Sequence, residues 1–583
     1  MACFLLGNYV YKSFHPGASV HVKFCVFVFG DHITTVNHMD NGDFLAMSAE
    51  TAEVSDIVAE PIKMGMSRKL SWLGAFWIAS GVPAYVLFSL AELPSTAGNI
   101  AWLVWIAIVL LGTMHAFTYA EISGLFPHKS GGSALYGAIA WIPYAKIVGP
   151  IMAWVYWLGW TPIITIGCSL AAGYSLEMLL PATSVINTWS LTVVNLSFLS
   201  SGLSLRINSV YILGAAFMMI SYMIQRGGVF RTYRTQMTLG VAGLTPLILV
   251  SLIPLFSGTV KLSRLYPFTP IGSNGWNGFA LTSVVGALFL AAYSAYGMEA
   301  AAVYTRELSN PKKDTVKAIL FTSAICLLVY GLLPLVFQGY LGMSGIMAPG
   351  VSSGLGVGDV LANMVGGGLI VKYIVVAALI MTLMLGVQTT MAGSSRALFQ
   401  ASRDGWLPQF LGQANKNRVP TYAMTTDLIF NFLLLSVSNY IYLLVISNVC
   451  YITFHYFAVN SAWIHRIDRP NVDRPYKMPK ALFVSGILMG FLDAFLIGMG
   501  TDVFGNGALW VGMVVVISVI PFFIYRHYIV DKGVFPKEYA DDIPVDHDHD
   551  AGFAKRAGVW PYVALSSAII IMIIGYKIGV YVA

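Results

Sequence analysis

Thirteen long apolar runs divide the sequence from about residue 70 onward, and they constrain the fold more than any other feature. A helix needs about 20 predominantly apolar residues to cross the hydrocarbon core of a bilayer. Only 10% of the residues are charged, against about 25% in soluble domains, so the chain cannot present a wetted surface on all sides. We therefore expect an all-α polytopic membrane protein with 12–13 spans. The runs cover residues 70–92, 101–126, 147–180, 209–225, 236–257, 279–304, 316–341, 368–393, 422–438, 440–465, 481–501, 507–530 and 559–583.

The third run, residues 147–180, is too long for a straight helix perpendicular to the membrane. A hydrophobic stretch that exceeds the thickness of the bilayer tilts, bends or leaves part of its length at the surface. We expect one of these arrangements here.

The basic residues predict the orientation of the spans, because Lys and Arg favour cytoplasmic segments. With the segment before the first span placed inside, the inside segments hold 26 Lys and Arg residues. The outside segments between the first twelve spans hold 4. This asymmetry predicts an inside N-terminus and, with a thirteenth span, an outside C-terminus. The net charge of +6 is spread along the chain rather than clustered, which argues against nucleic acid as a partner.

Four segments follow from this division of the chain. Residues 1–64 form a leader that we expect to be disordered, with the true start at Met47; the alternative is a genuine unstructured extension. Residues 65–530 form a twelve-span domain, and residues 559–583 a thirteenth span. Between them, residues 531–558 form a cytoplasmic loop with alternating Asp and His at 546–550, which we interpret as a solvated acidic loop rather than a metal site.

The five cysteines give no sign of a cofactor, a metal site or a disulfide framework. None of them forms a Cys-x-x-Cys pair, and the last three lie inside apolar runs, where a cysteine acts as a small core residue. The sequence therefore predicts no metal and no cofactor. The cysteines are Cys3, Cys25, Cys168, Cys326 and Cys450.

Two spans contain residues that loosen a helix. In the first span, "WIASGVPAYV", Pro83 lacks a backbone donor and obstructs the preceding turn, and Gly81 leaves the backbone unshielded. The sixth span contains the stretch 294–297, Ser-Ala-Tyr-Gly. Each alone would be an ordinary kink of a membrane helix. Spans one and six open two five-span halves, and transporters with inverted repeats break corresponding helices around a substrate in mid-membrane.

Three separated motifs, in order, resemble those of the amino acid–polyamine–organocation permease family, in its bacterial amino acid permease type. The resemblance covers roughly residues 65–480. At the exit of span six it rests on Gly297, Glu299, Asn310, Pro311, Lys312 and Lys313. After span two it rests on Glu121, Pro127, Gly131, Gly132 and Tyr136. At the exit of span eight it rests on Ser395, Arg396, Arg403, Asp404, Gly405 and Pro408.

The resemblance implies a leucine-transporter-type fold, a five-plus-five inverted repeat with discontinuous helices 1 and 6. The chain departs from the family in three respects. Residues 79–83 read Ala-Ser-Gly-Val-Pro, where the family has Gly-Ser-Gly-hydrophobic-aromatic. The fifth span has no lysine, which some proton-coupled members carry, and the last span is additional. The second departure leaves both H⁺ and Na⁺ as candidate coupling ions.

The two breaks predict where a substrate would bind. Backbone N–H groups at the start of a helical segment attract an anion, and the carbonyls at the end of one attract a cation. We expect the first break to bind the carboxylate of an amino acid and the second its ammonium group, with Trp157 and Trp160 as further candidate walls. The candidate substrate-binding residues are Ser80, Gly81, Val82, Tyr293, Ser294, Tyr296 and Gly297.

Glu299 follows directly after the break in span six. A charged acid at bilayer depth costs about 2.5–3.5 kcal/mol on insertion scales, so it is expected to have a partner or a role. We expect the freed N–H groups of span one as its partners, and coupling through loading and release of a proton as its role. The alternatives are a sodium site formed with Thr389 or Thr390 of span eight, and a structural tie without a part in transport.

Together these features predict a secondary active transporter that carries an amino acid across the bacterial cell membrane by alternating access, as a symporter or an antiporter. Aromatic walls favour a neutral or aromatic substrate, and the alternative is a transporter or exchanger of polyamines or organic amines. A channel would need a pore-lining repeat, which the sequence lacks. A membrane-embedded enzyme would need paired acids; Asp427 and Asp493 are far apart in the chain, and Asp359 of a GxGD pattern lies in an outside loop.

Overall fold

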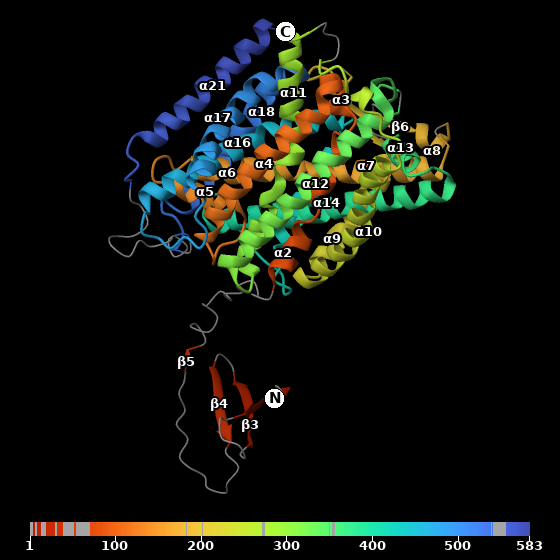
Figure 1. Cartoon of the computed structure of the whole chain (residues 1–583). Helices are drawn as coiled ribbons and strands as arrows, with labels where there is room; N and C mark the ends of the chain where they lie inside the picture. The colour runs from red at the N-terminus through yellow and green to blue at the C-terminus, as the bar shows by residue number, and fades with distance from the viewer. Residues whose placement is uncertain are drawn as a thin grey trace. The chain divides into compact units, whose positions relative to one another are not determined.

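The apolar runs fold into helices at each of the thirteen predicted spans (Figure 1). The computed structural model describes residues 70–582 apart from 182, 201, 271–274, 349, 352–355, 506, 538 and 540–554, together with five strands before residue 54. The chain divides into two units, residues 1–65 and 66–583. Most of the alternating Asp and His loop therefore lies outside the described residues.

The second unit consists mainly of helices, and their bounds follow the predicted runs closely. Of the described helices, ten are long and apolar enough to cross a membrane, and Trp72–Phe88 and Thr421–Leu435 are shorter apolar helices. This confirms an all-α polytopic membrane protein. The span helices are α2 (Trp72–Ala79) with η1 (Val82–Phe88), α3 (Glu92–Ala97) with η2 (Gly98–Ile100) and α4 (Ala101–Gly124), α6 (Val148–Trp160) with α7 (Pro162–Leu179), α9 (Ser209–Arg226), α10 (Val229–Phe256), α11 (Gly278–Ala295) with η4 (Gly297–Glu307), α12 (Pro311–Ile346), α14 (Leu369–Arg403), α15 (Thr421–Leu435), α16 (Tyr440–Asp468), α17 (Lys480–Gly500) with η6 (Asp502–Phe504), α18 (Gly507–Ile517) with α19 (Ile520–Phe523) and the π-helix η7 (Ile524–Val530), and α21 (Trp560–Val582).

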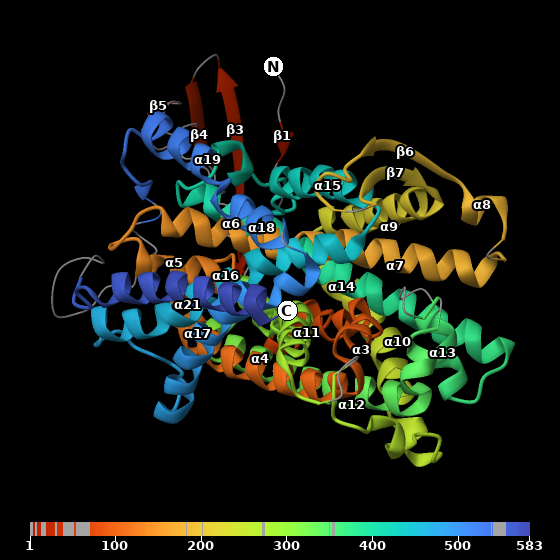
Figure 2. The ribbon, with the colours of Figure 1, turned by 90° about the horizontal axis from the view of Figure 1, so that it is seen from above.

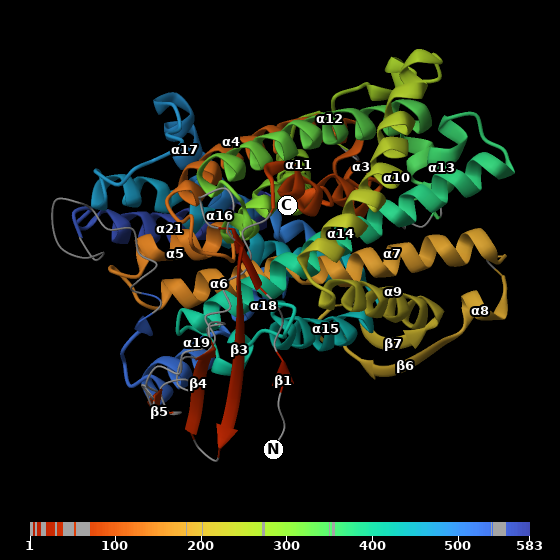
Figure 3. The same cartoon turned by 90° about the horizontal axis from the view of Figure 1, so that it is seen from below.

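The connections add short elements that the hydropathy pattern does not predict. Strands β6 (Ser190–Asn195) and β7 (Ser204–Asn208) form an antiparallel hairpin, which lies beside α9 (Figure 3). The remaining elements are α5 (Ser133–Trp141), α8 (Val185–Thr188), η3 (Leu262–Leu265), α13 (Val357–Met364) and η5 (Gln409–Gly412).

The long third run divides at Pro162 into α6 and α7. Proline is tolerated at the first position of a helix because its missing N–H would be unpaired there in any case. The predicted irregularity of this run is therefore a division into two consecutive helices.

Helix α21 extends from one end of the bundle to the other. Near its start, the Ala557 N–H donates to Asp468 Oδ1 at 2.8 Å. At its end, Val582 lies against Gly278, the first residue of α11. The helix packs along α17 (Figure 2). The two run parallel, because Gly498 lies against Met572 and Asp502 lies against Gly579. A thirteenth span parallel to the eleventh agrees with the predicted alternation, which places both in the inside-to-outside direction.

The N-terminal unit contains five short strands, where the sequence predicts a disordered leader. Strand β3 pairs with β1, β2 and β4, and β4 pairs with β5, all antiparallel. The other residues of this unit lie outside the described residues, and the start at Met47 stays a prediction. The strands are β1 (Phe4–Leu5), β2 (Tyr9–Lys12), β3 (Ser19–Phe29), β4 (His32–His38) and β5 (Ala52–Glu53).

Candidate functional site

The first span breaks where the sequence predicts. Helix α2 ends at Ala79, and the tighter 3-10 helix η1 begins at Val82. Side chains from other spans satisfy the backbone at the break: the Gly81 N–H donates to Thr389 Oγ1 at 3.2 Å, and that hydroxyl donates to the Ile78 carbonyl at 2.7 Å. Ser80 bonds within its own helix, to the Trp77 carbonyl. The break is thus braced by α14.

Gly81 permits the close approach of α14. A Cβ atom at this position would lie 2.5 Å from Thr389 Oγ1 and 2.7 Å from Gly386 Cα. Cβ atoms do not tolerate such distances to backbone, so any larger residue would push the two spans apart. The space beside Gly81, which we expected a substrate oxygen to occupy, is filled by α14 in this structure.

The sixth span breaks at the matching position. Helix α11 ends at Ala295, and the 3-10 helix η4 runs from Gly297 to Glu307. In a 3-10 helix each N–H donates to the carbonyl three residues earlier in the chain, instead of four residues earlier as in an α-helix. The carbonyls left without an N–H partner at the junction therefore differ. Both breaks are changes of helix type rather than unwound segments.

Tyr330 of α12 joins the two breaks. Its hydroxyl lies 2.7 Å from the Val82 carbonyl and 2.8 Å from the Ser294 carbonyl. One hydroxyl carries one hydrogen, so it can donate to only one of the two carbonyls at a time. The Ser294 hydroxyl donates to the Tyr85 carbonyl at 2.8 Å, which adds a second tie between the spans.

The partners of Glu299 differ from those we expected. The carboxylate is fully buried, and its Oε1 accepts from Tyr451 of α16 at 2.9 Å and from Trp160 of α6 at 3.2 Å. The expected N–H groups of span one are instead paired as described above. The second oxygen, Oε2, makes no hydrogen bond to another of the described residues. Glu299 is therefore a buried acid with two neutral donors and one unsatisfied oxygen.

The other predicted site residues divide into two groups. Trp160 contacts Glu299, and Tyr293 packs edge-on against Tyr451 with ring centroids 5.9 Å apart. Trp157 points elsewhere and donates to Asp427 Oδ1 at 2.8 Å. Thr389 and Thr390 bond to span one rather than to Glu299: Thr390 Oγ1 lies 2.8 Å from the Tyr85 hydroxyl. The proposed sodium site therefore is not assembled in this structure.

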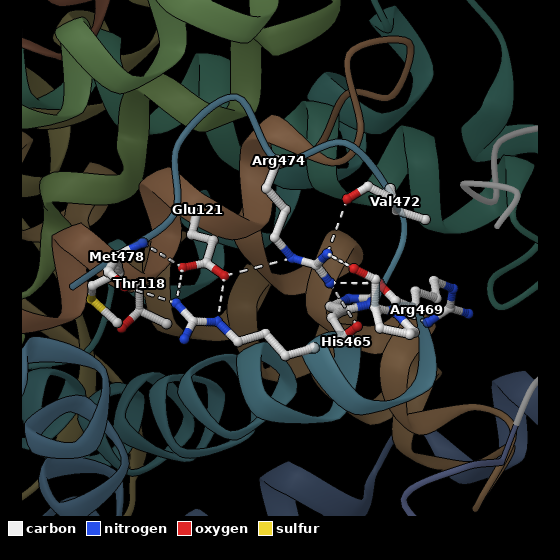
Figure 4. Close-up of polar contacts among 9 residues, drawn as sticks. Thr118, Glu121, His465, Arg469, Val472, Arg474 and Met478 are labelled. Carbon is white, nitrogen blue, oxygen red and sulfur yellow. Dashed lines mark hydrogen bonds and ion pairs between the residues drawn. The ribbon is translucent and has the colours of Figure 1, made fainter. Parts of the chain in front are cut away.

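The motif residues of the predicted cytoplasmic segments form buried ion pairs. Glu121 at the end of α4 is bound by Arg466 of α16, with Nε–Oε1 2.8 Å and Nη2–Oε2 2.6 Å. Figure 4 shows the Glu121 carboxylate with Met478 and Arg474 beside it. The Met478 N–H also donates to Glu121 Oε2 at 2.8 Å. Arg474 approaches the same carboxylate at 3.8 Å and donates to the Val472 carbonyl of its own loop and to the His465 carbonyl of α16. This cluster fastens the loop between α16 and α17 to α4.

Two further pairs lie at the exits of spans six and eight. Arg396 binds Glu307 at 2.8 Å, and Lys129 binds Asp404 at 2.7 Å; all four side chains are buried. Arg403 packs over the ring of Phe399. No sequence signal specified Arg466, Glu307 or Lys129 as the partners of the motif residues.

The glycine pair of the second motif forms a turn that only glycine adopts readily. Gly131 and Gly132 have φ angles of +96° and +88°. The Gly131 N–H donates to the Val303 carbonyl of η4 at 3.3 Å, and the Tyr136 hydroxyl donates to the Ala302 carbonyl at 3.0 Å. The motif thus docks the loop onto the second half of span six.

A cavity of about 190 Å³ is lined in part by Arg396 and Glu307. The predicted topology places this cavity on the cytoplasmic side. None of the break residues lines it, and Ser80, Val82, Tyr293, Ser294, Tyr296 and Glu299 are all fully buried. Its other lining residues are Gly227, Gly228, Val229, Phe230, Asn417 and Arg418.

The three acids that the sequence analysis considered for an enzyme have different partners in the structure. Asp427 accepts from Trp157, Thr161 and Ser394, whereas Asp493 contacts Tyr296 and His115. Asp359 forms a surface ion pair with Lys372 at 2.9 Å. Within the described part of the chain, no group of three or more His, Cys, Asp or Glu side chains could hold a metal ion.

Comparison with known proteins places these features in a family. A model of the amino acid permease family matches residues 70–523. The branched-chain amino acid permease BcaP of Bacillus subtilis (strain 168) is 23% identical over 280 residues, 48% of this chain and 56% of that protein. BcaP of Lactococcus lactis subsp. cremoris (strain MG1363) is 25% identical over 276 residues, 46% and 56% of the two chains. The arginine/ornithine antiporter ArcD2 of the same strain is 25% identical over 376 residues, 60% and 68% of the two chains. The chain thus spans little more than half the length of the two BcaP proteins.

Proposed function

We propose, from the premise that this chain belongs to the amino acid permease family, that it is a secondary active transporter of a neutral amino acid. The protein is an integral, multi-pass protein of the cell membrane. The observation that carries the proposal is the juxtaposition of two helix breaks, joined by the Tyr330 hydroxyl at the Val82 and Ser294 carbonyls. Such paired breaks leave backbone groups in mid-membrane that suit a zwitterion.

In the proposed binding mode the substrate replaces hydrogen bonds that the empty site makes internally. Its carboxylate takes the Gly81 N–H from the Thr389 hydroxyl, with Ser80 and Val82 beside it. Its ammonium group takes the Ser294 carbonyl from Tyr330, near Tyr296 and Gly297. Because both exchanges trade one hydrogen bond for a charge-assisted one, each favours the bound state.

Alternating access requires that the site opens to each side in turn. We propose that the ion pairs Glu121–Arg466, Arg396–Glu307 and Lys129–Asp404 close the cytoplasmic side in the state seen here. The cavity beside Arg396 is the inner end of the release path in this proposal. Separation of the Arg396–Glu307 pair would connect it with the second half of span six.

The coupling ion is proposed to be a proton, carried by Glu299. Glu299 is fully buried, and neither of its two side-chain hydrogen-bond partners, Tyr451 and Trp160, carries a positive charge. Burial of a carboxyl group without a basic partner favours its protonated state when the site is closed. Water that reaches the site on opening would let the proton leave. Na⁺ remains the alternative, and would require Thr389 or Thr390 to release span one.

The substrate class can be tested by counterflow. Proteoliposomes preloaded with leucine should take up radiolabelled leucine, because the names of the two BcaP relatives and the aromatic walls Trp160 and Tyr293 favour an apolar side chain. Unlabelled isoleucine and valine should compete, and putrescine should not, since it lacks a carboxylate. Arginine and ornithine serve as the comparison with the named substrates of ArcD2. Counterflow with putrescine and none with any amino acid would favour the organic amine alternative.

A further inference from the structure

A second buried acid lies behind the break of span six, on a helix outside the two five-span halves. Asp493 of α17 is fully buried, and its Oδ1 accepts from the Tyr296 hydroxyl at 3.0 Å. Its Oδ2 lies 3.2 Å from His115 Nε2 of α4. Tyr296 lies between the end of α11 at Ala295 and the start of η4 at Gly297, so Asp493 contacts the junction of span six directly.

The groups around Asp493 form a continuous buried cluster that reaches Glu299. The His115 ring stacks on His455 of α16 with centroids 5.4 Å apart, and the Tyr119 hydroxyl hydrogen-bonds His455 Nδ1. The His455 ring packs edge-on against Tyr451 at 4.4 Å, and Tyr451 donates to Glu299. Two acids, two imidazoles and three tyrosines from α4, α11, η4, α16 and α17 thus lie in contact, and each of them is fully buried.

Several donor and acceptor atoms of the cluster make no hydrogen bond to the described residues. Both ring nitrogens of His115, His455 Nε2, Asp493 Oδ2 and Glu299 Oε2 make no hydrogen bond to another of the described residues, so the 3.2 Å approach of His115 Nε2 to Asp493 Oδ2 is a close contact only. Within the same residues, His115 is the only partner of Asp493 that can carry a positive charge. A neutral imidazole has one N–H and one lone pair, so such a cluster has vacant positions for a proton.

Resting on the proposed transport function, we propose that His115 and Asp493 form a second proton-binding site that controls the junction of span six. A proton from water adds to the lone pair of the His115 imidazole and gives an imidazolium beside the Asp493 carboxylate. The charge of the pair changes from −1 to 0, and release of the proton restores it. No bond other than N–H forms or breaks.

The site acts on transport through Tyr296. When His115 is neutral, Tyr296 is the strongest donor to Asp493, and the junction is held against α17. When His115 is protonated, the imidazolium takes over the neutralisation of the carboxylate, and the hold on Tyr296 weakens. Gly297 follows Tyr296 directly, so the proton state of the pair sets the freedom of the second half of span six to move.

The experiment compares Asp493→Asn and His115→Gln with the wild-type chain in proteoliposomes. Both variants should retain leucine counterflow within about twofold, because neither side chain contacts the Gly81 N–H or the Ser294 carbonyl, the two groups proposed to bind the substrate. Under an imposed inward pH gradient of one unit, one coupled proton supports about tenfold accumulation. The wild-type chain should approach this level. Both variants should stop at the equilibrium level, because in this proposal the proton on Glu299 drives accumulation only when the His115–Asp493 pair controls the movement of span six. Asp427→Asn is the matched control: this buried acid has other partners, and its variant should accumulate like wild type.

Each outcome separates the site from the transport function. Absence of wild-type counterflow with any amino acid would reject the transport function itself. Wild-type counterflow together with full pH-driven accumulation by Asp493→Asn or His115→Gln would reject the second proton site alone. Should Asp493→Asn fail to fold, by size-exclusion profile, the His115→Gln result decides. A direct readout is the proton uptake that accompanies leucine influx, followed with a pH dye inside the vesicles: it should fall to background in both variants, and an unchanged signal would also overturn the proposal.

Discussion

Glu299 is the side chain whose surroundings fit its proposed role most closely. Two neutral donors, Tyr451 and Trp160, share one of its oxygens, and the other oxygen has no partner among the described side chains. An acid that takes up a proton in the closed state needs one oxygen free to carry it.

We expect Glu299→Gln to retain counterflow and to lose pH-driven accumulation. The amide oxygen still accepts from Tyr451 and Trp160, so the local structure is kept, but the side chain no longer titrates. Leucine in the vesicles should reach the equilibrium level instead of about tenfold above it for a one-unit gradient. Full accumulation by this variant would leave Glu299 as a structural tie.

A substitution at Gly81 tests whether the close contact between the first break and α14 matters for stability and uptake. We expect Gly81→Val to abolish leucine uptake and to lower the free energy of unfolding by about 1–3 kcal/mol, since the new side chain collides with Gly386 and Thr389. The measurement is uptake together with the melting temperature in detergent. Gly331→Val is the matched control, because a Cβ at Gly331 of α12 meets nothing within 4 Å. Equal behaviour of the two variants would contradict the packing account.

At the scale of elements, the sequence predicts where the helix breaks lie better than it predicts which side chains contact them. Gly81, Pro83 and Gly297 act on their own helices, so the two breaks carry a local signal and were found. The side chains that brace them come from distant spans: Tyr330 of α12 and Thr389 of α14 reach the breaks only after the bundle has packed. The expected pairing of Glu299 with span one was wrong for the same reason, because that backbone is taken by α14. The β6–β7 hairpin was not predicted, because its strands have only six and five residues, exposed in β6 and half-buried in β7, and lie in a connection between two apolar runs.

The loop between α16 and α17 depends on one ion-pair cluster. We expect Glu121→Ala to lower the free energy of unfolding by about 1–3 kcal/mol, because it leaves Arg466 and the Met478 N–H without their acceptor. Thermal unfolding in detergent gives the measurement. Asp473→Ala is the control: its ion pair with Lys312 is largely exposed, and such pairs contribute little. A melting temperature of Glu121→Ala equal to that of the control would show that the cluster does not stabilise the fold.

At the scale of the whole molecule, the charge asymmetry and the packing of α21 support one topology. Ala557 lies beside Asp468, which follows ten predicted spans, and Val582 lies beside Gly278, which follows five. Ten spans place Asp468 on the same side of the membrane as the N-terminus, and five spans place Gly278 on the opposite side. The two ends of α21 therefore lie on opposite sides of the membrane. We expect a reporter fused after Ala583 to be active only outside. Activity only in the cytoplasm would remove the thirteenth span.

The central claim is that this chain moves an amino acid against its gradient at the expense of a proton gradient. The most direct measurement is the time course of radiolabelled leucine in proteoliposomes with no gradient, with an inward pH gradient and with an inward sodium gradient. We expect equilibration without a gradient, transient accumulation above that level with the pH gradient, and no accumulation with sodium alone. Accumulation driven by sodium, or equilibration alone under all three conditions, would contradict it.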